Sequence, residues 1–207
     1  NGKYTFTMPA SNVEVKATFM DDNTMLNFFV DIKASDYFYD AVLWAAEKGI
    51  TGGTDSTHFT PGGICTRAQA VTFLWRAAGS PAPKSTAMPF TDVAAGSYYE
   101  QAVLWTVENG ITKGTSDTTF SPNAYVTREQ LATMLWRYDG SPAPSAGTVM
   151  DFPDLADLSD WAADAMTWAV DQKIVQGYNG TLIPREPAIR GQVAAMLWRY
   201  LGSPLWV

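Results

Sequence analysis

The sequence contains little of the residue types that carry most metal-binding and covalent catalytic chemistry. It holds one cysteine, Cys65, and one histidine, His58, among 207 residues. A single cysteine excludes an internal disulfide and a zinc site built on paired cysteines. A nucleophile–histidine pair would have to use His58, which lies in a segment that we expect to be a surface loop. These shortages argue against an enzyme, and no cofactor is expected.

Positive charge and long apolar runs are also scarce. The 14 basic residues are outnumbered by 21 acidic ones, which gives a formal net charge of −7. Nucleic acids and anionic membranes attract basic surfaces, so neither is expected as the main partner. No stretch reaches about 18 uninterrupted apolar residues, so no membrane insertion is predicted. The 46% of hydrophobic residues are enough for a sizeable core.

One segment occurs three times. In each copy an arginine precedes apolar residues at helical spacing, then Leu-Trp-Arg, then Gly-Ser-Pro. Thr66 with Gln69, and Thr127 with Gln130, have the spacing of a capping box. Each copy therefore predicts a helix of about three turns that begins at the arginine. The opening arginines recur every 61 or 62 residues: Arg67, Arg128 and Arg190.

An arginine in the first turn of a helix lies beside unpaired N–H groups and the positive end of the helix dipole. We expect it to be exposed and, with these backbone donors, to provide a place for a carboxylate or phosphate. In the third copy Ile189 replaces the capping threonine and Gly191 adds flexibility, so the third site is expected to be weaker. A structural role at the helix C-terminus is expected for Arg76, Arg137 and Arg199.

Each copy also has a first helix upstream. These helices are apolar nearly all round, which predicts burial, and we expect them to meet one another at the centre of the body. A Phe-x-Asp motif, or in the third copy Phe-Pro-Asp, precedes each one and supplies Asp31, Asp92 and Asp154. A turn follows each one, where we expect positive φ or a close backbone approach at Gly53, Gly114 and Gly177.

The first 20 residues do not belong to the repeat. Their alternating apolar residues predict a β-hairpin. Because two strands are rarely stable alone, we interpret residues 1–20 as the tail of a preceding β module, with an arm packed on the helical body as the alternative. Residues 21–27 are expected to be a linker, and the repeats are placed at 28–83, 84–144 and 145–207. No signal peptide opens the chain, which fits a C-terminal portion of a longer protein.

In register, the copies resemble three tandem S-layer homology modules over residues 29–204, and the hairpin resembles the closing strands of small β-repeats on Gram-positive surface proteins. The matching motifs are Phe-x-Asp, an Ala-rich Trp helix, Gly-Ile-x-x-Gly, Phe-x-Pro and Thr-Arg-x-Gln. The resemblance implies a mainly α fold, with three helix-loop-helix repeats in a pseudo-threefold bundle, first helices at its axis, after a short N-terminal β-hairpin. It also implies non-covalent anchoring of an extracellular protein to the cell wall of a Gram-positive-type bacterium. The ligand would be pyruvylated secondary cell-wall polysaccharide, a peptidoglycan-linked glycan, bound in grooves between repeats.

Carried over to this sequence, the resemblance makes the three opening arginines the ligands of the pyruvate carboxylate. It makes the three aspartates hydroxyl acceptors or groove supports, although each could equally cap a helix or brace a loop. It places the three glycines along the grooves. A second hypothesis is a structural or protein–protein interaction module of a surface layer, favoured if the arginines are buried in ion pairs. Self-assembly through upstream domains is left open.

Overall fold

The computed structural model describes residues 27–202, and the expected hairpin lies outside them. The described residues form six α-helices and two short 3-10 helices, with isolated β-bridges but no sheet. None of these helices is long and apolar enough to cross a membrane. The elements are α1 (Tyr39–Glu47), α2 (Arg67–Ala77), α3 (Glu100–Glu108), α4 (Arg128–Tyr138), η1 (Leu155–Asp157), η2 (Asp160–Ala162), α5 (Ala163–Asp171) and α6 (Arg190–Leu201).

The second helix of each repeat begins at its arginine, as predicted. At the start of α2, Thr66 Oγ1 accepts from the Gln69 N–H (3.3 Å), and Gln69 Oε1 accepts from the Thr66 N–H (3.1 Å). The start of α4 repeats this capping box. At α6 only half of it forms: Gln192 Oε1 accepts from the Ile189 N–H (3.2 Å), but isoleucine has no oxygen with which to accept in return.

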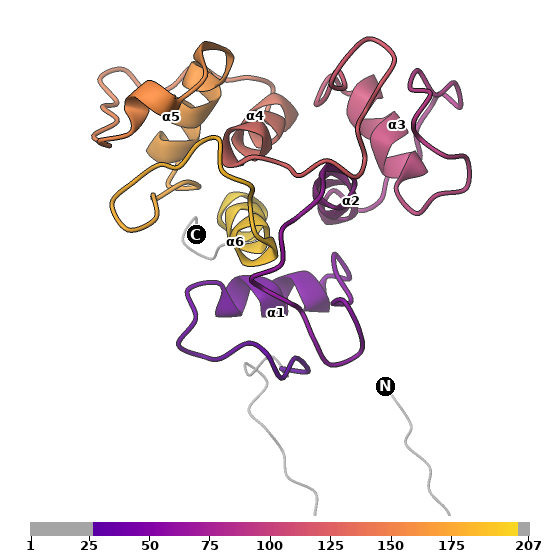
Figure 1. The fold of residues 1–207 in the computed structure, drawn as a ribbon, viewed down its shortest axis with the longest axis horizontal. Coiled ribbons are helices and arrows are strands. Elements are labelled where there is room, and N and C mark those ends of the chain that lie inside the picture. The colour runs from indigo at the N-terminus through magenta and orange to yellow at the C-terminus, as the bar shows by residue number, and fades with distance from the viewer. Residues whose placement is uncertain (1–26, 203–207) are drawn as a thin grey trace, which may run out of the picture.

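The second helices, not the first, occupy the centre of the molecule. Figure 1 shows α2, α4 and α6 in the middle, with α1, α3 and α5 at the outside of three lobes. In agreement with this view, α6 contacts both α2 and α4. The expectation that the first helices meet at the centre is therefore wrong. Apolar residues of its own repeat cover α1 on one side and α6 covers it on another, so its burial needs no contact with α3 or α5.

Each lobe combines helices from two repeats. The first helix of a repeat packs on the second helix of the repeat before it, so α3 packs on α2 and α5 packs on α4. The first repeat has no predecessor, and α1 packs on α6 of the third repeat. The series of helix pairs therefore closes on itself (Figure 1).

Three backbone hydrogen bonds close a ring where the repeats meet. The Cys65 N–H donates to the Ala188 carbonyl oxygen (2.9 Å), the Ala188 N–H to that of Val126 (2.8 Å), and the Val126 N–H to that of Cys65 (3.1 Å). All three side chains are fully buried. Burial raises the pKa of the Cys65 thiol to about 12, so Cys65 packs in the ring as a small, uncharged residue. Each repeat thus contributes one residue to the ring.

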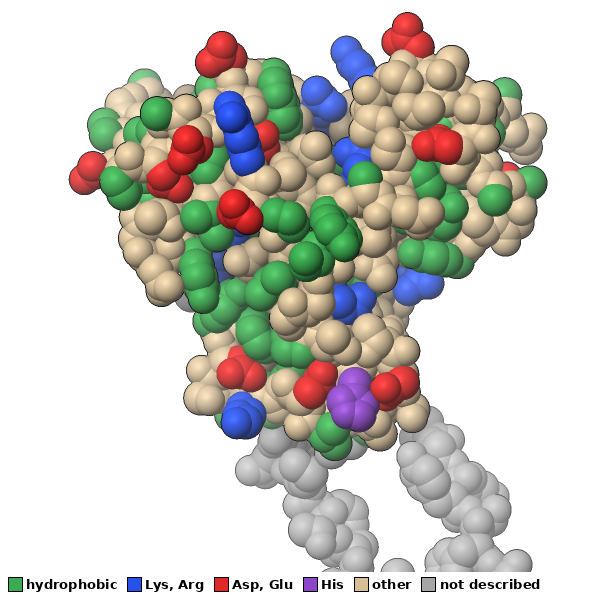
Figure 2. All heavy atoms as spheres, in the orientation of Figure 1, with side chains coloured by type: hydrophobic (Ala, Val, Ile, Leu, Met, Phe, Trp, Pro, Cys, Tyr) green, Lys and Arg blue, Asp and Glu red, His purple; other side chains and the backbone are tan. Residues whose placement is uncertain are grey.

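Hydrophobic side chains also reach the surface near the centre. Figure 2 shows them gathered across the middle of the face in view, whereas most acidic side chains lie toward the outer ends of the lobes.

We predict that the first repeat cannot fold alone. A fragment of residues 28–83 would contain α1 without its partner α6, and α2 without its partner α3. It should therefore remain molten or aggregate, whereas the whole chain should unfold in one cooperative transition. Thermal unfolding followed by near-UV circular dichroism tests this prediction, and a sharp transition for the fragment alone would contradict it.

Candidate functional site

Each arginine that opens a second helix reaches into the following repeat. Its Nε–H donates to a backbone carbonyl oxygen there, and the side chain is 4% exposed in all three copies. The expectation that these arginines are exposed is therefore wrong, because each one holds two repeats together. The bonds run from Arg67 to Phe120 (2.9 Å), from Arg128 to Leu182 (3.0 Å) and from Arg190 to Phe59 (2.8 Å).

The backbone N–H groups at these helix starts are also occupied. In α2 the Arg67 N–H donates to the Ala124 carbonyl oxygen (2.9 Å) and the Ala68 N–H to that of Pro122 (3.0 Å). Carbonyl oxygens of the third repeat accept from the first two N–H groups of α4, and carbonyl oxygens of the first repeat accept from those of α6. The expectation that these donors are available to an anion is therefore wrong, because the neighbouring repeat already satisfies them. The guanidinium Nη groups are what these helix starts can offer to a ligand.

One Nη group of Arg67 has no partner in the protein. Its Nη2 atom is buried and makes no hydrogen bond, and the same is true of Arg190 Nη2. Burial lowers the pKa of Arg67, and the nearby carboxylate of Asp92 partly opposes this effect. A buried donor on a charged group that lacks an acceptor costs about 1–3 kcal/mol or more.

The aspartates brace the loops that receive the arginines. Asp92 Oδ1 accepts from the Phe120 N–H (2.8 Å), and Oδ2 accepts from the Ser121 N–H (2.7 Å). Ser121 has a φ of 58°, which is strained for a residue with a side chain. Asp31 and Asp154 make the same pairs of bonds. Loop bracing is the role that this geometry supports, and a role as hydroxyl acceptors stays a prediction.

The glycines in register meet both of the expected requirements. Gly114 has a φ of +82°, and a Cβ atom there would lie 2.5 Å from Cε1 of Phe90 and 2.5 Å from the Thr119 carbonyl oxygen. Gly53 and Gly177 have φ values of +85° and +78° and face their own phenylalanines equally closely. This close approach packs the glycine turn against the Phe-x-Asp segment of the same repeat.

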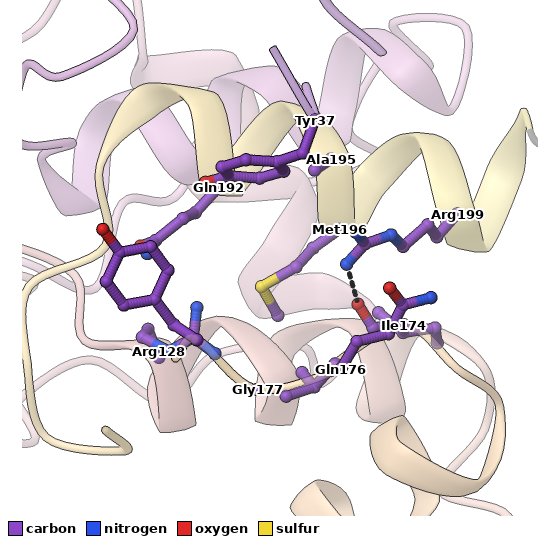
Figure 3. A pocket seen from close by; sticks show the side chains of 11 residues that line it. Tyr37, Arg128, Ile174, Gln176, Gly177, Gln192, Ala195, Met196 and Arg199 are labelled. Atoms are coloured by element: carbon purple, nitrogen blue, oxygen red, sulfur yellow. Dashed lines mark hydrogen bonds between the residues drawn. The ribbon is translucent and has the colours of Figure 1, made fainter. Parts of the chain in front are cut away.

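Two grooves contain residues from all three repeats. The first, which we call the Arg128 groove, has a volume of about 230 Å³. Arg128 comes from the second repeat, Gly177 and α6 from the third, and Tyr37 from the first. Figure 3 shows Arg128 and Arg199 at opposite ends, with Met196 between them. Arg199 Nη1 donates to the Ile174 carbonyl oxygen (3.2 Å), which fixes that end of the groove (Figure 3).

The second groove, which we call the Arg67 groove, is lined by the equivalent residues of the preceding repeats. Its volume is about 330 Å³, and it is lined by Arg67 of the first repeat, the turn around Gly114 and α4 of the second, and Trp161 of the third. Arg137 corresponds to Arg199 and donates to the Ile111 carbonyl oxygen (3.4 Å). Lys113 adds a further positive charge to the lining.

Both grooves are cationic. Each is lined by two arginines, and no aspartate or glutamate lines either of them. Burial lowers the pKa of Arg128; Tyr37 and Asp154 oppose this effect, whereas the positive charge of Arg199 adds to it. One buried and one half-buried guanidinium group, with no carboxylate in the lining of the same groove, favour an anionic ligand.

The surroundings of Arg190 differ from those of the other two arginines. Its guanidinium carbon lies 4.7 Å from the ring centre of Phe59 and 5.4 Å from that of Phe73. Phe73 stands where the two grooves have the slimmer Met134 and Met196. The guanidinium therefore already contacts two aromatic rings, which leaves less of it for a ligand.

Gly191 has a packing role rather than the expected flexibility. A Cβ atom on it would lie 2.7 Å from the Phe38 ring, so the glycine lets α1 approach α6 closely. Among the other singled-out residues, His58 is exposed in a loop and bonds Asp55, as a surface residue would. The described residues contain no group of three His, Cys, Asp or Glu side chains that could hold a metal ion.

The structure adds residues to the grooves that the sequence pattern had not assigned to them. Tyr37 and Trp161 each line a groove. They occupy equivalent positions, four residues before the first buried alanine of the first helix, where the second repeat has Tyr98. The recurrence of an aromatic residue at this position was the feature of the sequence from which a role in the grooves could have been inferred. Arg137 and Arg199, for which a role at the helix C-terminus was expected, bond instead to the carbonyl oxygens of Ile111 and Ile174 and also line the grooves.

We predict that a methyl group at Gly114 destabilises the protein far more than one at Gly110. Both glycines have positive φ, but a Cβ on Gly110 would meet nothing within 4 Å. Gly110→Ala should cost about 1 kcal/mol from backbone strain alone. Gly114→Ala should cost about 2–4 kcal/mol, because overpacking against Phe90 adds to the strain. Urea unfolding of the two variants measures this difference, and equal losses would show that the close contact is unimportant.

Comparison with known proteins agrees with this architecture. The family model of the S-layer homology domain matches residues 28–71, 89–132 and 151–194. The Surface-layer 125 kDa protein of Lysinibacillus sphaericus is 32% identical over 171 residues, which are 81% of this chain and 14% of that protein. An endoglucanase of Bacillus sp. (strain KSM-635) is 38% identical over 179 residues, 83% of this chain and 19% of that protein. The S-layer protein sap of Bacillus anthracis is 26% identical over 176 residues, 82% and 20% of the two chains.

The chain therefore spans only a small part of each of these relatives, between 14% and 20% of their length. The three matched segments each include a Phe-x-Asp or Phe-Pro-Asp segment, a first helix and the start of a second helix. Together they cover more than half of the sequence. This chain belongs to the S-layer homology domain family.

Proposed function

We propose that this chain anchors a surface protein to the cell wall by binding pyruvylated secondary cell-wall polysaccharide in the Arg67 and Arg128 grooves. S-layer homology domains are binding modules, and the relatives include S-layer proteins, which supports a location at the cell surface. The further steps, a Gram-positive-type wall and a pyruvate carboxylate as the recognised group, belong to the proposal.

The cationic lining of the grooves carries this proposal. A pyruvate ketal presents a carboxylate on a sugar ring, and each groove offers two guanidinium groups with no competing acid. Because the Nε of Arg67 is already used by Phe120, and that of Arg128 by Leu182, the Nη groups are the guanidinium donors left for a ligand. Each groove also has an exposed aromatic ring that can pack against the sugar. Trp161 provides it in the Arg67 groove and Tyr37 in the Arg128 groove.

The alternative, a structural module without direct glycan binding, would be favoured by arginines buried in ion pairs. Within residues 27–202, the ion pairs are Lys48 with Glu47 and His58 with Asp55, and both are exposed. Arg67 and Arg128 are buried and bond to backbone carbonyl oxygens, and the nearby carboxylates of Asp92 and Asp154 act on their pKa values without forming ion pairs with them. The observation that would favour the alternative is therefore not found in this part of the chain.

We also propose that the three repeats form a single pseudo-threefold binding unit. The closed ring of Cys65, Val126 and Ala188 supports this arrangement, as does the cyclic pairing of the helices. Because each groove draws on all three repeats, no single repeat can present one.

Arg67→Ala is the central test. Loss of a charge-assisted contact of about 1.5–3 kcal/mol should weaken binding at the Arg67 groove by one to two decades. The variant should also be less stable, because the Nε bond to Phe120 disappears with the side chain. Binding to purified cell walls should therefore be measured well below the melting temperature of the variant. Arg185→Ala, which removes the same charge from an exposed position, is the matched control and should bind as the wild type does.

Chemical removal of pyruvate from the wall polysaccharide completes this test. The stripped polymer should bind the wild type and Arg67→Ala almost equally, because the group that Arg67 contacts is gone. If the stripped polymer binds the wild type as tightly as the intact polymer does, the grooves do not recognise a carboxylate and the proposal is wrong.

We predict that Arg190 contributes least to wall binding. Its guanidinium contacts the rings of Phe59 and Phe73, and its helix start has only half of a capping box. Arg190→Ala should therefore weaken binding less than Arg128→Ala, as measured by sedimentation with cell walls. Equal losses would show that the third arginine serves a groove as good as the other two.

A further inference from the structure

A second hollow adjoins the Arg128 groove. It has a volume of about 190 Å³ and lies between the end of α4, α5 and the end of α6. Ile174 and Arg199 line both the hollow and the groove. Because Arg199 Nη1 bonds to the Ile174 carbonyl oxygen, this pair forms a fixed boundary between the two spaces. The other residues of the hollow are Asp139, Trp168, Gln172 and Tyr200.

The wall of the hollow is held in place by several contacts. The Tyr200 hydroxyl donates to Asp139 Oδ1 (2.8 Å), which ties the end of α6 to the end of α4. The Tyr200 ring also packs edge to face against Trp168, with 5.7 Å between ring centres, and against Tyr138 at 6.1 Å. A half-buried aromatic ring with a fixed orientation and a neighbouring carboxylate is therefore present before any ligand arrives.

The chemistry of the hollow differs from that of the groove beside it. The groove has two arginines and no acid, whereas the hollow pairs one acid, Asp139, with one arginine, Arg199. The amide of Gln172 can both donate and accept hydrogen bonds. Asp139 disfavours a second carboxylate, while the carboxylate, amide and guanidinium together suit hydroxyl groups around a ring with an apolar face.

We propose that the hollow is a subsite for a neutral sugar unit, adjacent in the polymer to the anionic unit held in the Arg128 groove. The polymer would pass the boundary formed by Arg199 and Ile174, so Arg199 would contact both units. This inference rests on the proposed function for its account of the polymer, but binding of a neutral sugar to the hollow can be tested without it.

The pairing of an acid with a tyrosine, as in Asp139 and Tyr200, occurs once among the repeats. At the two positions filled by Asp139 and Tyr200, the ends of α2 and α4 have Ala78 and Tyr138, and the ends of α6 and α2 have Leu201 and Ala77. The acid and the tyrosine that bonds it therefore occur together only where the end of α4 meets the end of α6. The Arg128 groove should consequently prefer a longer piece of glycan than the Arg67 groove does.

Nuclear magnetic resonance of the whole chain can test the subsite directly. The neutral probe is the methyl glycoside of N-acetylglucosamine, titrated while the side-chain amide of Gln172 and the indole N–H of Trp168 are followed. These signals should shift with a dissociation constant of about 1–10 mM, weak binding typical of few contacts. The equivalent signals of Asn109 and Trp105, in the lobe that lacks the acid, should shift much less.

Variants then separate the hollow from the groove. Asp139→Ala and Gln172→Ala should each weaken binding of the neutral probe by about threefold to tenfold, as loss of a hydrogen bond predicts. Lys48→Ala, the counterpart of Gln172 on α1, is the matched control and should have no effect. Gln176→Ala, which removes an exposed side chain that lines the groove but not the hollow, should leave the neutral probe unaffected.

Three results would overturn the subsite: no shift of the Gln172 and Trp168 signals, equal shifts of the Asn109 and Trp105 signals, or equal loss of binding in Gln176→Ala. The wild-type shifts decide the first two even if a variant fails to fold. Sodium pyruvate, titrated separately, tests the groove through the Nε signal of Arg128. Failure of pyruvate to bind would count against the proposed function, while a positive result with the neutral probe would still establish the hollow as a sugar site.

Discussion

The fold depends on how the N–H groups at the starts of the central helices are satisfied. A helix leaves its first four N–H groups without partners of its own. In α2 and α4 the capping box serves two of them, and carbonyl oxygens of the next repeat serve the other two. Each second helix therefore needs the loop of the following repeat, and α6 obtains its loop from the first repeat. The chain has to close into a ring because the end groups of its helices have no other partners.

Because the helix starts meet the loops of neighbouring repeats, the arginine at each start both stabilises the fold and is available to a ligand. The Nε of each opening arginine bonds to the loop of the next repeat, and that loop is held by an aspartate of its own repeat. The Nη groups take no part in this bond between repeats, and the side chains of Arg67 and Arg128 each line a groove. A ligand that accepts from these Nη groups would thus bind to a junction between repeats. Ligand binding and ring closure should stabilise each other for this reason.

The three copies share one framework but differ at the contacts between lobes. Gly191 in α6 admits the ring of Phe38, whereas the equivalent Glu129 in α4 is buried and accepts from the N–H (3.1 Å) and hydroxyl (3.0 Å) of Ser159. These substitutions keep the same helix pairing with different side chains. The sites are also unequal: one groove has Lys113 and Trp161, while the other adjoins a hollow along Ile174 and Arg199.

The sequence by itself determined the local structure. The repeat spacing, the capping boxes at Thr66 and Thr127 and the glycines with positive φ are set by neighbouring residues, so helix starts and turns could be predicted from them. It also identified the arginines as special, because they recur in register. Only the tertiary structure decided which helices lie at the centre, since an apolar helix does not specify the surface that will bury it. The tertiary structure also decided that the helix N–H groups are occupied. It brought Arg137, Arg199 and Trp161 into the grooves and placed Asp139 beside Tyr200. These contacts join residues from different repeats, and local spacing carries no information about partners that the closure of the ring brings together.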